Sequence, residues 1–175
     1  MLVESVAPIF PGSRHDLRYL PMRPSFPETF MDIAVLMARR ATCERRRVGA
    51  VAVVDRRPVV SGYNGPPPGQ AHCTEVGCTL DPDTGGCSRS IHAEANVVAW
   101  AARRGTSLEG AEVYTTTAPC RPCAQLLVAA GVETVRFLES YRRTGGLDFL
   151  RDAGVKVVQT LGSLRVEDDK PRGAR

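Results

Sequence analysis

The sequence predicts one α/β domain built on a five-stranded mixed sheet. The chain of 175 residues, 43% hydrophobic and 24% charged, is long enough for a single core and short for two. An early pair of apolar segments is typical of a β-hairpin. Helical and strand periods then alternate through the second half of the chain, which indicates a sheet whose C-terminal half is parallel.

The first half of the chain divides into an arm, a helix and the hairpin. Five of the thirteen prolines lie in residues 1–27, which predicts an extended N-terminal arm. Apolar side chains at helical spacing from Phe30 to Ala38 predict the first helix. Two apolar runs around a charged break predict the hairpin, with strands over 48–54 and 58–61.

The stretch 62–90 is rich in glycine and proline and predicts a long loop. A loop of this length in a compact domain is usually functional or held in place by something. Beyond it, apolar periods and glycine stop signals predict helices over 91–104, 120–130 and 147–153, and strands over 112–117, 133–138 and 155–159. We therefore expect the domain to span 28–162 and a flexible tail to span 163–175.

Composition excludes several classes of protein. No apolar run approaches the roughly 20 residues of a membrane-spanning helix. The N-terminus carries Glu4 and no basic segment before its apolar residues, so it is a poor signal peptide. The net charge of +4 is too small to indicate a nucleic-acid partner. We expect a cytoplasmic protein with no membrane or nucleic-acid partner.

Two short motifs predict a catalytic zinc site. His92-Ala93-Glu94 opens one predicted helix, and Pro119-Cys120-Arg-Pro-Cys123 opens the next. Cysteines three apart at a helix start lie on one face, and the positive helix N-terminus favours their thiolates. Two thiolates and one imidazole give Zn²⁺ three protein ligands and leave the fourth position to water, whose pKa zinc lowers toward neutrality.

Glu94 is not needed as a ligand and suits proton transfer. It can take a proton from water and deliver it to a ring nitrogen and then to departing ammonia. An H-x-E motif followed by P-C-x-x-C is the signature of zinc-dependent nucleobase deaminases. The alternative is a thioredoxin-like redox pair at Cys120 and Cys123 with an unrelated His92, but the joint occurrence of all these residues favours the deaminase.

Further segments extend the pattern along the chain. They are Thr42-Cys43, Val48-Gly49-Ala50, Gly62-Tyr63-Asn64-Gly65, His72-Cys73-Thr-Glu-Val-Gly-Cys78, His92-Ala93-Glu94-Ala95-Asn96, Tyr114-Thr115-Thr116 and Pro119-Cys120-Arg-Pro-Cys123. With them, residues from about 30 to 160 resemble the deoxycytidylate deaminase family of the cytidine deaminase superfamily, especially its bacterial competence-operon-type members. The resemblance implies a three-layer α/β/α fold, zinc-dependent hydrolysis of dCMP to dUMP and ammonia, a homo-oligomer (hexamer or dimer), activation by dCTP and inhibition by dTTP.

The resemblance also implies which residues contact the substrate. Asn64 is expected to hydrogen-bond the sugar, although Asn-Gly pairs are also common in turns. The backbone of Ala93 is expected to meet the base. Thr116, Thr117 and Ala118 are expected to line the pocket wall, although strand threonines are ordinary β-formers.

Aromatic and basic residues complete the expected substrate site. Tyr141 is a candidate to pack on the base, with an ordinary surface tyrosine as the alternative. Guanidinium groups bind phosphate in pairs of hydrogen bonds, and runs of arginine lie at 45–47 and 142–143. A charged run is often only a solvated face, and Arg45 is preferred because the bacterial relatives commonly have an arginine there.

Four cysteines remain after the catalytic pair: Cys43, Cys73, Cys78 and Cys87. A second, structural zinc would explain how the long loop is ordered. Some members of the family, including phage enzymes, hold such a zinc with cysteines equivalent to Cys43 and Cys73. His72 competes with the cysteines as a ligand. Disulfides or inert thiols are the alternatives, and the lack of an export signal disfavours disulfides.

These observations predict a dCMP deaminase in which Glu94 is the catalytic residue. One alternative is a deaminase of CMP, a modified cytosine nucleotide or a secondary-metabolite intermediate. An alternative of another class is a non-catalytic nucleotide-binding or assembly protein on the same fold. The intact set of His92, Glu94, Cys120 and Cys123 argues against a non-catalytic protein, since a protein that has lost its activity has no need to keep these residues.

Overall fold

The computed structural model describes residues 23–82, 85–140, 145–162 and 164. One sheet has the strand order β2-β1-β3-β4-β5. β1 pairs antiparallel with β2 and β3, while β3, β4 and β5 are parallel to one another, which confirms the predicted mixed sheet. The strands are β1 (Gly49–Val54), β2 (Arg57–Tyr63), β3 (Glu112–Thr117), β4 (Thr134–Glu139) and β5 (Lys156–Gln159).

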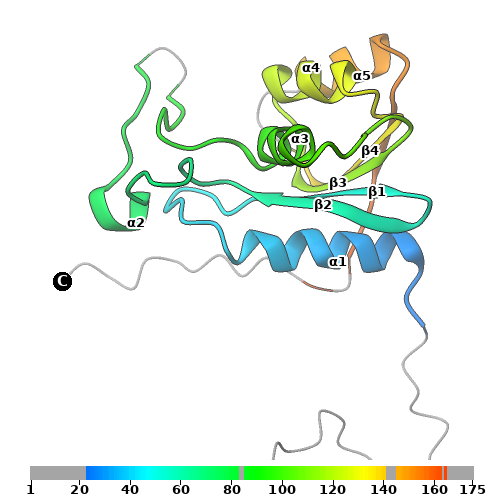
Figure 1. Ribbon diagram of the computed structural model, residues 1–175, viewed down its shortest axis with the longest axis horizontal. Coiled ribbons are helices and arrows are strands. Elements are labelled where there is room, and N and C mark those ends of the chain that lie inside the picture. The colour runs from blue at the N-terminus through cyan, green and yellow to red at the C-terminus, as the bar shows by residue number, and fades with distance from the viewer. Residues whose placement is uncertain (1–22, 83–84, 141–144, 163, 165–175) are drawn as a thin grey trace, which may run out of the picture.

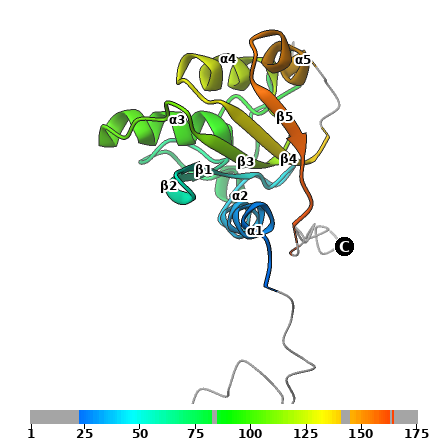
Figure 2. The same cartoon turned by 90° about the vertical axis from the view of Figure 1, so that its right-hand side faces the viewer.

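Helices cover both faces of the sheet. α1 (Phe26–Ala38) lies on one face, and α3 (Ala93–Arg104), α4 (Arg121–Ala129) and α5 (Gly145–Asp152) lie on the other (Figures 1 and 2). The expected three-layer α/β/α sandwich is confirmed. Among the described residues, no helix is long and apolar enough to cross a membrane.

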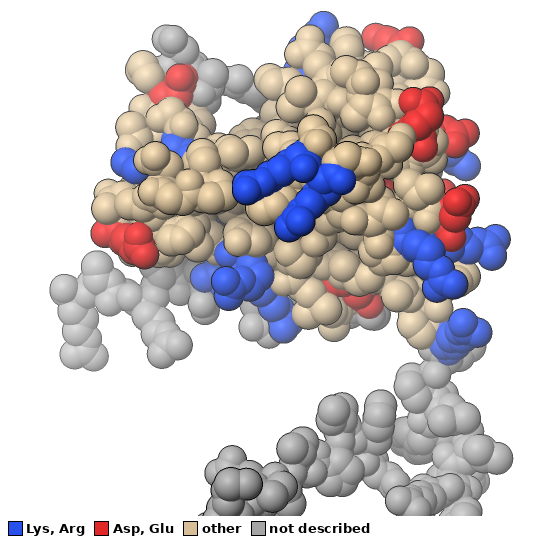
Figure 3. Space-filling view, in the orientation of Figure 1, with Lys and Arg blue, Asp and Glu red and all other residues tan. Residues whose placement is uncertain are grey.

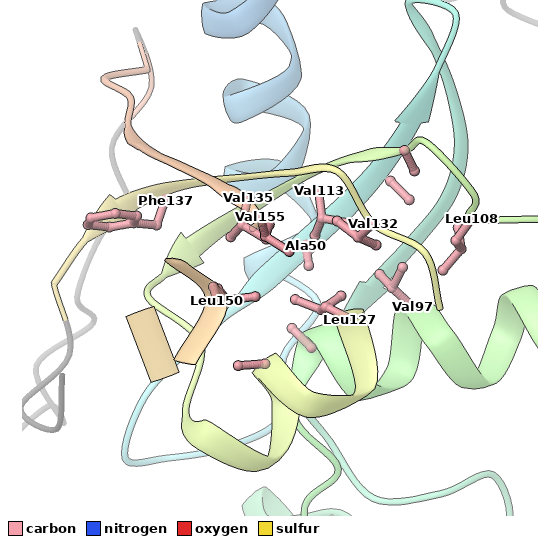
Figure 4. Close-up of a cluster of buried hydrophobic side chains, with 14 of the residues drawn as sticks. Ala50, Val97, Leu108, Val113, Leu127, Val132, Val135, Phe137, Leu150 and Val155 are labelled. Atoms are coloured by element: carbon pink, nitrogen blue, oxygen red, sulfur yellow. The ribbon is translucent and has the colours of Figure 1, made fainter. Parts of the chain in front are cut away.

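Two hydrophobic cores fill the spaces between the layers. The larger core joins the sheet to α3, α4 and α5, and Figure 4 shows its side chains meeting there: Ala50, Val113 and Val135 from the sheet, with Val97, Leu127 and Leu150 from the helices. The smaller core joins the opposite face to α1 through residues that include Met31, Val51 and Tyr114. Because strand side chains alternate between faces, β1 and β3 contribute to both cores and hold the layers in register.

Two local features differ from the sequence prediction. α1 begins at Phe26, inside the predicted arm. Pro27 is tolerated in the first helical turn because N–H groups there have no hydrogen-bond acceptor within the helix, so its missing N–H costs nothing. Ser25 and Glu28 close a capping box around that start. The predicted loop 62–90 contains one short helix, α2 (Cys73–Val76), which was not expected. Residues 1–22 of the arm, and the tail except Leu164, lie outside the described residues.

Candidate active site

Two helix starts bring the predicted zinc ligands together. His92 is the N-cap residue of α3, and Cys120 is the N-cap residue of α4, with Cys123 in the first turn. Two glycines allow this approach. A Cβ at Gly62 of β2 would lie 2.7 Å from the carbonyl oxygen of Ala93, and a Cβ at Gly146 of α5 would lie 2.0 Å from that of Pro119.

The geometry of the three ligand atoms fits a zinc ion. Nδ1 of His92 lies 3.3 Å from the sulfur of Cys120 and 3.4 Å from the sulfur of Cys123. Tetrahedral zinc with ordinary Zn–N and Zn–S bonds holds a nitrogen and a sulfur about 3.6 Å apart. His92 is exposed, whereas Cys123 is buried. The three atoms therefore close one side of a zinc site and leave the other side accessible.

The charge of the sulfurs also suits a metal site. The Cys123 thiol donates a hydrogen bond to the sulfur of Cys120, and with His92 it lowers the pKa of Cys120 to about 4, against the opposing effect of burial. The same hydrogen bond and burial raise the pKa of Cys123.

Glu94 lies beside these ligands in the first turn of α3. Its side chain is 4% exposed, and burial raises the pKa of its carboxyl group. The hydroxyl of Thr115 on β3 lies 3.2 Å from Oε1 of Glu94 and 3.0 Å from the carbonyl oxygen of Thr117, and it shares its one proton between these two acceptors. A buried carboxyl group with a raised pKa suits both taking up a proton and releasing it.

Thr115 is a residue that sequence reasoning missed, and Thr116 is one that it placed differently. The alternation of side chains along β3 turns Thr115 toward Glu94 and turns Thr116 the other way, where its hydroxyl accepts a hydrogen bond from the N–H of Gly49. Thr116 is not among the residues that line the cavity in front of Glu94, where the sequence placed it. Alternation predicts that these two threonines point to opposite faces of the sheet, but it does not say which of them faces Glu94.

A cavity of about 530 Å³ opens in front of Glu94, which is an ordinary size for a small-molecule site. Its catalytic side includes His92, Ala93, Glu94, Thr117, Ala118 and Cys120. The remaining lining residues from two stretches of chain form a surface that we call the loop wall. It consists of Cys43, Arg45, Arg46, Gly85, Gly86, Cys87 and Ser90. Tyr141 and the arginines at 142–143 lie outside the described residues.

Asn64 also lines the cavity and is hydrogen-bonded to the backbone beside the loop wall. Its Oδ1 accepts from the N–H of Val48 over 2.7 Å, and its Nδ2 donates to the carbonyl oxygen of Arg46 over 2.9 Å. The amide group keeps one N–H and one lone pair beyond these two bonds. Asn64 therefore fixes the backbone next to the cavity and retains hydrogen-bonding capacity toward it.

Three of the remaining cysteines form a second cluster. The sulfurs of Cys73, Cys78 and Cys87 all lie within 4.8 Å of one another, and those of Cys73 and Cys87 are 3.7 Å apart. Cys43 is buried and interacts electrostatically with Cys78, although it is not part of this close group. Nδ1 of His72 lies 3.0 Å from the hydroxyl of Thr42. None of the six cysteines, all of which lie within the described residues, forms a disulfide.

Positive charge near the cavity comes from single side chains. Arg45 and Arg46 line the loop wall. On the face seen in Figure 3, basic side chains stand in separate groups and acidic groups lie among them. A phosphate entering the cavity would meet the guanidinium groups of Arg45 and Arg46.

Comparisons with known proteins agree with this geometry. The family model described as "Cytidine and deoxycytidylate deaminase zinc-binding region" matches residues 24–139. ComE operon protein 2 of Bacillus subtilis is 38% identical over 151 residues, which is 86% of this chain and 79% of that protein. Deoxycytidylate deaminase of Mycobacterium phage D29 is 40% identical over 122 residues, which is 65% of this chain and 94% of that protein.

A solved structure shares both the fold and much of the sequence. The dCMP deaminase of cyanophage S-TIM5, determined in complex with dCMP and dUMP, superposes with a TM-score of 0.69 at 33% identity. The match covers 78% of this chain and 98% of that chain.

Proposed function

The chain belongs to the family of zinc-dependent cytidine and deoxycytidylate deaminases, and on that basis we propose that it converts dCMP and water into dUMP and ammonia. One observation carries the proposal. The buried carboxyl group of Glu94 faces a cavity of nucleotide size beside three ligand atoms that fit an open zinc site. Relatives named deoxycytidylate deaminase support dCMP as the substrate.

The residues divide the chemistry among them. His92, Cys120 and Cys123 hold the zinc ion, which supplies Lewis-acid activation of a water molecule when it is bound. Glu94 accepts a proton from the water that adds to C4 of cytosine and passes it to N3 of the ring. It then transfers the second proton to the exocyclic nitrogen, which leaves as ammonia, and the oxygen of the water becomes O4 of dUMP.

The walls of the cavity would hold the remaining parts of the substrate. Asn64, which lines the cavity, contacts the sugar through the hydrogen-bonding capacity that its backbone contacts leave over. The backbone of Ala93 meets the base, and Thr117 and Ala118 form the wall beside it. Arg45 binds the 5′-phosphate from the loop wall. A role for Tyr141 stays a prediction.

A second zinc ion would be structural and held by Cys73, Cys78 and Cys87. Tetrahedral zinc holds two sulfurs about 3.8 Å apart, close to the 3.7 Å between Cys73 and Cys87. The fourth ligand comes from Cys43 or His72. Cys43 is close enough to affect the pKa of Cys78, and the contact of Nδ1 of His72 with Thr42 leaves Nε2 of that ring for a metal ion.

Ammonia release tests the proposed activity. The zinc-loaded chain is assayed with dCMP, CMP, deoxycytidine and a 5-substituted dCMP, and dCMP should give the highest kcat/KM. No ammonia from dCMP would contradict the proposal, and equal or faster release from CMP would move the substrate to the ribonucleotide.

Metal analysis separates the two proposed zinc sites. The wild-type chain should contain two zinc ions, and Cys120→Ser and Cys78→Ser should each contain one. A wild-type chain with a single zinc ion that Cys120→Ser removes would rule out the structural site. The cytoplasmic location, the homo-oligomer, and the effects of dCTP and dTTP stay predictions.

A further inference from the structure

The two guanidinium groups of the loop wall are anchored to different parts of the protein. Arg46 forms an ion pair with Glu139, at the end of β4, over 3.0 Å. Its carbonyl oxygen also accepts the hydrogen bond from Asn64. Arg46 is therefore held by Glu139 of the sheet and by Asn64.

Arg45 is held instead by the loop that contains Cys73, Cys78 and Cys87. Its guanidinium group donates a hydrogen bond to the carbonyl oxygen of Gly85, which lies 40 positions further along the chain. Both Arg45 and Gly85 line the cavity. The position of this guanidinium group thus depends on where the chain carries Gly85.

The cysteine cluster lies at the base of the segment that carries Gly85. Cys78 and Cys87 flank a short hairpin, in which Leu80 pairs with Cys87 and the N–H of Asp81 donates to the carbonyl oxygen of Gly86 over 2.8 Å. The sulfurs of Cys78 and Cys87 meet that of Cys73 at the base of this hairpin. As Figure 1 shows, the segment with α2 extends beyond one end of the sheet, so the helix layers do not cover it.

We propose that the cluster of Cys73, Cys78 and Cys87 positions Arg45 for the substrate and thereby sets the preference for a nucleotide over a nucleoside. The inference rests on the proposed function, because it assumes that a 5′-phosphate meets the loop wall. Cys73 and Cys78 are positioning residues, since they do not line the cavity and act through Gly85 and Arg45.

The physical reason is preorganisation. A guanidinium group that is already held in place binds a phosphate without first losing the freedom of a long side chain. When the cluster is broken, the hairpin and its Gly85 carbonyl are no longer fixed, and Arg45 loses its anchor. A ligand without a phosphate does not use Arg45 and should bind as before.

Calorimetric binding tests the inference without relying on turnover. Zinc-loaded chains carrying Glu94→Gln, which prevents reaction, are titrated with dCMP and with deoxycytidine. The test variants in this background are Arg45→Ala, Cys78→Ser and the two combined. The matched control is Val76→Ser, which changes a solvent-exposed side chain of α2 in the same loop.

Arg45→Ala should raise the Kd for dCMP about tenfold, the loss typical of a charge-assisted hydrogen bond. Cys78→Ser should raise it by a similar factor, and the double variant should bind dCMP no more weakly than Arg45→Ala alone, because both changes remove the same contact. The Kd for deoxycytidine should change less than about twofold in every variant. Val76→Ser should match the parent for both ligands.

Several results would overturn the inference. Cys78→Ser could weaken the binding of dCMP and deoxycytidine equally, which would mean that the cluster only supports the fold. Alternatively, its effect on the Kd for dCMP could add fully to that of Arg45→Ala, which would mean that the two residues act independently. If Cys78→Ser does not fold, Gly85→Ala replaces it. An alanine there meets no atom within 4 Å but is strained at φ +63°, so it shifts the carbonyl group and keeps the sulfurs. An unchanged preference for dCMP in Gly85→Ala would refute the inference.

The proposed function fails in a different way. If the parent chain binds dCMP no better than deoxycytidine, the nucleotide substrate itself is wrong and the inference falls with it. If the parent prefers dCMP and the cysteine and glycine variants keep that preference, only the role of the cluster is wrong.

Discussion

Replacing Gly146 by alanine should disturb the catalytic zinc site, whereas the same change at Gly145 should not. A Cβ at Gly146 would lie 2.0 Å from the carbonyl oxygen of Pro119 and 2.9 Å from the carbonyl carbon of Cys120. A Cβ at Gly145 meets no atom within 4 Å. Real Cβ atoms do not approach closer than 3.0 Å, so the peptide that carries Cys120 has to move by about 1 Å.

The size of the effect follows from that displacement. Overpacking of this kind costs about 1–3 kcal/mol of folding stability, which lowers the Tm of a chain of this size by about 2–4 °C per kcal/mol. A metal site tolerates about 0.2 Å in its bond lengths, so the affinity for zinc should fall about 10- to 100-fold, as it does when the support of a ligand is lost.

Thermal melts and competition with a chromophoric zinc chelator measure the two effects. Gly145→Ala is the matched control, and its Tm should equal or exceed that of the wild type because alanine favours a helix over glycine. A Gly146→Ala variant with the zinc affinity and Tm of the wild type would refute the reasoning. Such a result would mean that α5 moves away from the added Cβ while the peptide that carries Cys120 stays in place.

Three further changes test the site and the core. Glu94→Gln should lower kcat at least about 100-fold and leave the zinc content unchanged, as ammonia release and metal analysis would show, and retained activity would remove Glu94 from the mechanism. Thr115→Val, which removes the hydroxyl that donates to Glu94, should lower kcat about two- to tenfold with little change in KM; an unchanged kcat would exclude a positioning role. Burial raises the pKa of Glu112, but hydrogen bonds from Arg136 and Tyr114 outweigh it and bring the pKa below 4.5. The stability contributed by this carboxylate is present above that value and is lost as the pH falls through the folded-state pKa. Urea midpoints between about pH 5 and pH 3 should therefore depend less on pH in Glu112→Gln than in the wild type, and equal pH dependence would contradict the assignment.

Much of the catalytic centre could be predicted because its ligands are marked by local patterns. His92 and Cys120 each stand immediately before a helix, where the N-cap position directs both toward the same space. The spacing of Cys120 and Cys123 places both sulfurs on one helix face without reference to the rest of the chain. The helix and strand periods around these motifs were predicted for the same reason, since they depend on neighbours a few residues away.

The threonines of β3 show where local patterns stop being informative. β3 is a central strand, and the structure buries its residues on both faces. A strand of this kind has no alternation of polar and apolar residues from which its faces can be assigned. Whether Thr115 or Thr116 faces Glu94 therefore depends on the register of β3 against β1, in which Ala50 pairs with Thr115.

The sequence by itself predicted the zinc ligands, the proton carrier and the order of the strands and longer helices, because each prediction depends on spacing along a short stretch of chain. Only the tertiary structure decided which segments complete the site. Arg45, Gly85, Glu94 and Thr117 come from four separate segments and meet at one cavity. The strand order of the sheet brings the segments of Glu94 and Thr117 together, and this order depends on contacts between residues far apart in the sequence.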